Sequence, residues 1–173
     1  NRNAFMSCQI LKEVILPSTL KGMAYYCFGG CYSLENIILP ETLETIGGSA
    51  FSGTNISEIV IPESIRVLSS GLFEGCDNLH KVVLPQNIKE ISSSAFQNCN
   101  SLKAIELPES LEYIGADAFQ NSGLESIVLP NNLREIGSCA FESCCLYEIF
   151  FPKSLNDEPH KYNLLLSKIM NLS

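Results

Sequence analysis

The chain has 173 residues, of which 46% are hydrophobic and 17% charged, and its formal net charge at pH 7 is −8. This composition is typical of a globular protein rather than a disordered one. The acidic excess disfavours nucleic acid as a partner, because binding to a phosphate backbone depends on clustered Lys and Arg. The longest apolar stretches, such as IVIP and EIFFP, fall far short of the roughly 20 residues that cross a bilayer. We therefore expect no direct membrane insertion.

One phrase recurs along the whole chain with a period of 22 or 23 residues. Its phenylalanines are Phe5, Phe28, Phe51, Phe73, Phe96, Phe119 and Phe141. Its prolines are Pro17, Pro40, Pro62, Pro85, Pro108, Pro130 and Pro152. Such a period is typical of a solenoid, in which each repeat forms one rung. The chain opens with only the second half of a rung, NAFMSC at 3–8, and we interpret it as a fragment of a longer solenoid whose first edge is open to edge-to-edge self-association.

Each repeat contains two apolar residues separated by one position just before the proline. This spacing of two predicts a short strand with both residues facing the core. The predicted strands lie at 14–16, 37–39, 59–61, 82–84, 105–107, 127–129 and 149–151. Identical strands stacked rung upon rung form a parallel sheet. The sequence thus predicts an α/β fold, a right-handed solenoid with a parallel sheet of about seven short strands.

The segment after each proline predicts a different local structure. A small polar residue follows the proline by two positions and favours a bend. An apolar pair at spacing three comes next, as in Leu43 with Ile46, and then a small residue immediately before the phenylalanine, such as Ala95. We expect this stretch to form a helical or 3-10 turn on the back of each rung.

The repeat ends after Leu155. Asn156, Asp157 and Pro159 give a helix-start signal. Apolar residues then recur at helical spacing: Tyr162, Leu165, Leu166, Ile169 and Met170. We therefore expect leucine-rich repeats over 1–155 and a C-terminal capping helix over 156–173.

The position three residues after each phenylalanine is a column of small side chains, which we call the thiol column: Cys8, Cys31, Thr54, Cys76, Cys99, Ser122 and Cys144. A nucleophile would not be copied along a stack, so the column favours a buried, weakly hydrogen-bonding group, and free thiols are the preferred interpretation. Stacking brings Cys8 near Cys31 and Cys76 near Cys99, within reach of a disulfide, and that alternative stays open. Cys139 and Cys145 lie off the column. Zinc is disfavoured because no C-x-x-C pair exists.

The phrase L-x-x-I-x-L-P-x-x-L-x-x-I-x-x-x-A-F-x-x-C resembles the leucine-rich repeat of the BspA-like family, also called the Treponema-type repeat. The match is fullest in LKAIELPESLEYIGADAF (102–119) and close in LENIILPETLETIGGSAF (34–51). The resemblance covers roughly residues 4–155. It implies a solenoid without catalytic residues, in proteins found on or outside the surface of bacteria and some parasitic protists and linked with adhesion to host proteins and cells.

Binding to a protein is the function that the residues favour. The outward position between the two core residues of each strand forms what we call the apolar stripe, interrupted once by an acidic residue: Ile15, Ile38, Val60, Val83, Glu106, Val128 and Phe150. Glu58 and Lys81 lie beside it. Exposed contiguous apolar surface marks contact sites, although β-branched residues also simply suit strands. We expect these nine residues to contact a protein ligand or a second copy.

Enzymatic activity is not expected. His80 and His160 are the two histidines, His80 on a solvated surface and His160 in the cap, and no phosphate-binding or nucleophile motif is present. We expect no catalytic residue, no metal and no cofactor. A cell-surface or secreted module is the favoured interpretation; an intracellular (cytoplasmic) scaffold and a structural spacer are the alternatives. Sequons at Asn55 and Asn171 are too short to decide the compartment.

Overall fold

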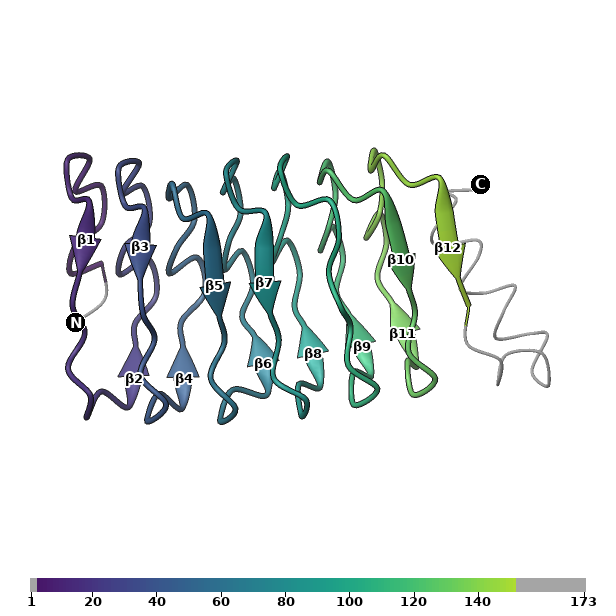
Figure 1. Cartoon of the computed structure of the whole chain (residues 1–173), viewed down its shortest axis with the longest axis horizontal. Helices are drawn as coiled ribbons and strands as arrows, with labels where there is room; N and C mark the ends of the chain where they lie inside the picture. Colours follow the sequence, from purple (N-terminus) through teal and green to yellow (C-terminus); the bar gives the residue numbers. More distant parts are fainter. Residues whose placement is uncertain (1–2, 152–173) are drawn as a thin grey trace.

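The computed structural model describes residues 3–151, and these form a stack of rungs with two rows of short parallel strands (Figure 1). The front row consists of β1 (Glu13–Val14), β3 (Asn36–Ile37), β5 (Glu58–Val60), β7 (Lys81–Val83), β10 (Ser126–Val128) and β12 (Glu148–Phe150). The second row consists of β2 (Gly22–Met23), β4 (Thr45–Ile46), β6 (Val67–Leu68), β8 (Glu90–Ile91), β9 (Tyr113–Ile114) and β11 (Glu135–Ile136). The predicted parallel solenoid is confirmed.

The front row is divided into separate strand pairs. β1 pairs with β3, β5 with β7, and β10 with β12, always in parallel and with equivalent repeat positions opposite one another. Residues 104–106 carry the same repeat phrase and still bury Ile105, but they form no strand within the described part of the chain. The predicted sheet of about seven strands is therefore an interrupted one.

The second row replaces the helical turns that the sequence predicted on the back, and that prediction is wrong for residues 3–151, where no helix occurs. Leu43 donates its backbone N–H to the carbonyl of Pro40 at 2.9 Å, which closes a turn, and Ile46 then points inward from β4. A turn followed by a strand places two side chains inside at spacing three, just as one helical turn would. The spacing of three between two apolar residues therefore could not distinguish a helical turn from a turn followed by a strand.

Around each phenylalanine the backbone forms an arc in which left-handed residues recur. Two residues before and two after the phenylalanine, φ is positive: Ser94 has φ 57° and Asn98 has φ 59° on either side of Phe96. Ser94, Phe96 and Asn98 donate their N–H groups to carbonyls of the next rung at 2.8 to 2.9 Å, while the intervening residues close turns within their own rung. A continuous helix is impossible here, because non-glycine residues enter the left-handed region only singly.

The phenylalanines form the centre of the core. Their rings stack along the solenoid with centroid separations of 5.2 to 6.1 Å between consecutive rungs and interplanar angles of at most 14°. Phe51, Phe73, Phe96 and Phe119 are fully buried. Each ring covers the next, so a rung buries its apolar face only through its neighbours.

Charged side chains also pair between rungs. Lys21 Nζ lies 2.7 Å from Glu44 Oε1. Glu112 contacts Lys89 at 2.6 Å and Arg134 at 3.2 Å. These contacts lower the pKa of the Glu112 carboxyl, chiefly through the hydrogen bond from Lys89. The predicted boundary at residue 155 and the capping helix lie outside the described residues.

Candidate functional site

The front row positions the apolar stripe on the surface. Core residues such as Ile37 and Ile59 face inward, and the alternation along each strand turns the following side chain toward solvent. Ile15 is 91% exposed and Ile38 86%, whereas Val83 is 44% exposed. Val60, Glu106, Val128 and Phe150 are also exposed. All seven stripe residues predicted from the sequence thus reach the surface.

The surface is hollowed at the N-terminal part of the stripe. A shallow groove of about 390 Å³ lies over β1 and β3 and includes Ile15, Ile38 and Pro40. A second groove, of about 510 Å³, lies over β3 and β5 and includes Ile38, Val60, Glu41 and Glu58. Ile38 belongs to both grooves, so the two hollows form one continuous surface across three rungs.

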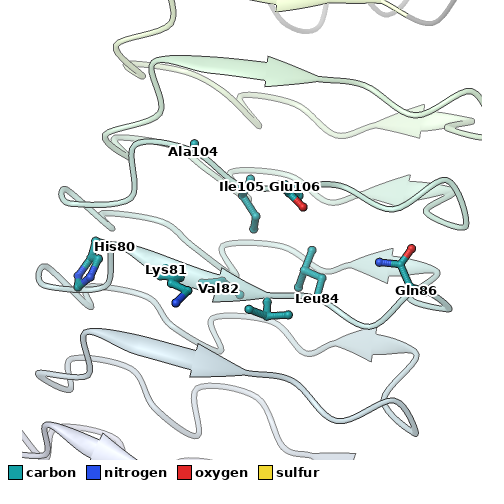
Figure 2. Close-up of a pocket in the computed structure, with 9 residues that line it drawn as sticks. His80, Lys81, Val82, Leu84, Gln86, Ala104, Ile105 and Glu106 are labelled. Carbon is teal, nitrogen blue, oxygen red and sulfur yellow. The ribbon is translucent and has the colours of Figure 1, made fainter.

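Glu106 marks the point where the stripe and the strand pairing are both interrupted. A groove of about 310 Å³ separates β7 from residues 104–106. Figure 2 shows His80 at one end of β7 and Gln86 beyond its other end, with Ile105 and Glu106 on the neighbouring rung. The stripe therefore consists of two parts, an N-terminal part with Ile15, Ile38, Val60 and Val83, and a C-terminal part with Val128 and Phe150.

Beside the stripe, Glu58 is the centre of a small charged cluster. Lys81 Nζ lies 3.0 Å from Glu58 Oε2, and His80 Nε2 lies 3.6 Å from Glu58 Oε1. The hydrogen bond from Lys81 lowers the pKa of the Glu58 carboxyl. The structure thus brings together the predicted contact residues Glu58 and Lys81, and it adds His80, which we had placed on a solvated surface without a role.

Sequence reasoning missed a second set of carboxylates on the other side of the stripe. Glu41 and Glu63 follow Pro40 and Pro62 directly, on consecutive rungs, and both are exposed. The signal was present in the sequence, because the residue after each of the seven repeat prolines forms a column of its own: Ser18, Glu41, Glu63, Gln86, Glu109, Asn131 and Lys153.

The thiol column lies inside the solenoid, away from this surface. Cys31, Cys76 and Cys99 are buried, and each donates its S–H to the carbonyl of the phenylalanine one rung earlier at 3.0 to 3.1 Å. All eight cysteines are free thiols. Burial raises the pKa of the Cys76 thiol to about 11 and that of Cys99 well above its ordinary value. A group held protonated in this way is a poor nucleophile.

Residues 3–151 contain neither a metal-binding cluster nor a membrane-spanning helix. No three His, Cys, Asp or Glu side chains within this range converge on a possible metal position. Nor does the described part of the chain contain a helix that could span a bilayer.

The stacked rungs, the inward Leu and Ile positions and the phenylalanine column together define a leucine-rich repeat solenoid. The sequence matches the model of the BspA type leucine-rich repeat region in six copies, over residues 1–122 and 112–162. The chain belongs to the BspA-type leucine-rich repeat family. No curated protein matches it.

Solved structures of bacterial leucine-rich repeat proteins resemble the chain. A Bacteroides ovatus protein is 26% identical with a TM-score of 0.62, and the match covers 88% of this chain and 58% of that one. A T. pallidum protein is 26% identical with a TM-score of 0.57, covering 86% of this chain and 81% of that one. A cell surface protein of Faecalibacterium prausnitzii shares the fold at 22% identity and TM-score 0.59, covering 94% and 58%. The chain thus spans a little over half the length of the Bacteroides and Faecalibacterium proteins.

Proposed function

We propose that the chain is a non-enzymatic protein-binding module that contacts its partner through the apolar stripe and the adjacent Glu58 and Lys81. The observation that carries the proposal is the exposure of Ile15, Ile38 and Val60 in a row of shallow grooves. A soluble surface rarely presents contiguous aliphatic side chains unless they are contacted. Solenoids bind through extended faces of this kind.

We further propose that the module belongs to a larger cell-surface or secreted protein that acts in adhesion or in binding host proteins. The family resemblance supports this assignment. The Faecalibacterium protein is itself called a cell surface protein, but its 22% identity establishes a shared fold alone. The same surface could serve an intracellular scaffold or a structural spacer, so the binding role is to be tested separately from the compartment.

The test compares the chain with a triple variant, Ile38→Lys/Val60→Lys/Val83→Lys. Peptides are selected from a random displayed library on the wild-type chain, and their affinities for both proteins are then measured. We expect the selected peptides to lose binding to the triple variant, because three charges replace the apolar contact surface. The fold should persist, since the three side chains point away from the core.

A matched control adds the same three charges elsewhere. Thr45, Val67 and Tyr113 are exposed on β4, β6 and β9 of the second row. Thr45→Lys/Val67→Lys/Tyr113→Lys should retain the peptides. Equal retention by both triple variants would refute the proposed binding face.

A further inference from the structure

The N-terminal part of the stripe is bordered by two carboxylates that lack partners. Glu41 and Glu63 occupy equivalent positions on consecutive rungs, each three residues after a stripe residue, Ile38 and Val60. Neither carboxylate has a hydrogen bond or ion pair to another residue of the described chain, and both side chains lie in solvent-exposed positions.

Three other carboxylates near the front face have partners within the chain. Glu58 pairs with Lys81, and Glu125 Oε1 lies 3.1 Å from Lys103 Nζ. Glu109, which belongs to the same column as Glu41 and Glu63, accepts hydrogen bonds from the backbone N–H and the Nδ2 of Asn131 at 2.9 to 3.1 Å. Like charges opposite one another in a parallel stack repel. A positively charged group from outside the chain would therefore relieve the repulsion between Glu41 and Glu63.

The groove over β3 and β5 joins this charge to the apolar stripe. Its lining places Ile38 and Val60 between Glu41 and the neutralised Glu58. A ligand that fills the groove with an apolar side chain places its neighbouring side chains near Glu41, which lines the groove, and Glu63 occupies the equivalent position on the next rung. An isolated small cation would satisfy the carboxylates but leave the aliphatic surface exposed.

We propose that the N-terminal part of the stripe binds a basic, amphipathic protein segment. Its apolar side chains cover Ile15, Ile38 and Val60, and its Lys or Arg side chains contact Glu41 and Glu63. The inference rests on the proposed function and specifies the chemistry of the partner. The chain's net charge of −8 attracts such a segment at long range, and the two carboxylates fix where it lies.

The test uses three synthetic peptides of one length, which alternate leucine with lysine, leucine with glutamate, and serine with lysine. Their affinities for the full chain are measured by fluorescence anisotropy at low and high salt. Only the leucine–lysine peptide combines both features, so we expect it to bind most tightly. Because exposed ion pairs contribute modestly, Glu41→Gln/Glu63→Gln should weaken this peptide about three- to tenfold and flatten its salt dependence.

A control of equal charge separates local from general attraction. Glu90→Gln/Glu135→Gln removes two carboxylates from β8 and β11 of the second row, and it should leave the affinity unchanged. If this control weakens binding as much as Glu41→Gln/Glu63→Gln does, or if the leucine–glutamate peptide binds equally well, the inference is overturned.

Two further outcomes have distinct meanings. If Ile38→Ser/Val60→Ser leaves the affinity of the leucine–lysine peptide intact, the apolar face itself is not used and the proposed function fails. If sedimentation shows a dimer that the same variant dissociates, a second copy occupies the face and the basic partner is excluded.

Discussion

The Sγ atom of Cys99 lies 3.1 Å from the carbonyl oxygen of Phe73, one rung earlier in the solenoid. Cys76 makes the same contact with Phe51, also at 3.1 Å. The thiols thus point along the stack at backbone carbonyls rather than at one another. The cysteines of the column act as small hydrogen-bond donors that link consecutive rungs, and Ser122 and Thr54 replace them with hydroxyls in two rungs.

The first prediction concerns thiol accessibility. Cys8 and Cys145 are exposed, whereas Cys76 and Cys99 are fully buried. With a thiol-specific reagent under native conditions we expect fast modification of Cys8 and Cys145, and modification of Cys76 and Cys99 only after unfolding. Mass spectrometry of quenched samples assigns each site. Early labelling of Cys99 would contradict the buried column.

The second prediction is a loss of stability at alkaline pH. The pKa of Cys76 is about 11 in the folded state and near 9.0 in an exposed thiol, so the folded protein holds this proton more tightly. The resulting stabilisation is complete below pH 9 and is lost as the pH rises through 11. Between about pH 8 and about pH 10.5, the free energy of unfolding should fall by about 2 kcal/mol more in the wild type than in Cys76→Ser.

Denaturant titrations at the two pH values measure this difference. All other ionisable groups are the same in the two proteins, so their contribution cancels in the comparison. Parallel pH dependences of the two proteins would show that the buried thiol contributes nothing.

A third prediction follows from the phenylalanine stack. Phe96 is fully buried between Phe73 and Phe119, whereas Phe5 is 50% exposed at the first rung. Phe96→Ala should lower the free energy of unfolding by about 3 to 5 kcal/mol, because it leaves a cavity in the core. Phe5→Ala should have a clearly smaller effect, because less of its surface is buried. Denaturant unfolding of both variants decides, and equal losses would argue against a stacked core.

The fourth prediction tests the left-handed positions of the phenylalanine arc. Ser94 has φ 57°. The equivalent position one rung earlier is occupied by Gly71, with φ 63°, so the rung accepts glycine here. Ser94→Gly should therefore be neutral or stabilising. Ser94→Val should destabilise the protein by about 1 to 2 kcal/mol, because a β-branched side chain is disfavoured in the left-handed region. If thermal unfolding showed that Ser94→Val is more stable than Ser94→Gly, the left-handed conformation at residue 94 would be disproved.

The fifth prediction concerns the division of the apolar stripe. Glu106 and the groove beside β7 separate Val128 and Phe150 from the N-terminal part. For peptides selected on the wild-type chain, Val128→Lys/Phe150→Lys should reduce affinity less than Ile38→Lys/Val60→Lys does. Affinity measurements on the two double variants provide the comparison, and the reverse order would place the contact surface at the other end.

Much of this architecture could be predicted because the repeat constrains it. A column of Phe96 and its equivalents must stack when every rung has the same length between proline and phenylalanine, and the structure confirms it. The outward direction of Ile38 and its equivalents followed equally from alternation along a strand. These features depend only on which residues recur, and the sequence displays that directly.

The back of the rung could not be predicted in the same way. Whether Leu43 and Ile46 belong to a helical turn or to a turn and a strand depends on backbone dihedrals, and a spacing of three is compatible with both. The sequence did not reveal the left-handed residues: Ser94, Asp117 and Asn98 have φ of 57 to 59°. Only the glycines at equivalent positions of other rungs indicate that the backbone there is left-handed. The unpaired state of Glu41 was also hidden, since it depends on which cations reach across rungs.

The hydrogen bonds of the phenylalanine arc all run in one direction. Phe28, Phe51 and Phe73 each donate an N–H to the carbonyl of the residue before the next phenylalanine, at 2.8 to 3.1 Å, and no bond of this set runs backward within residues 3–151. Peptide dipoles aligned in this way add along the axis. On the second row the backbone hydrogen bonds run the opposite way, since Glu44 donates its N–H to Lys21 at 2.8 Å and Gly47 donates to Met23 at 2.9 Å, so the peptide dipoles of the two sides oppose each other. Each inner rung therefore both donates to and accepts from each of its two neighbours, which ties it to both sides of the stack.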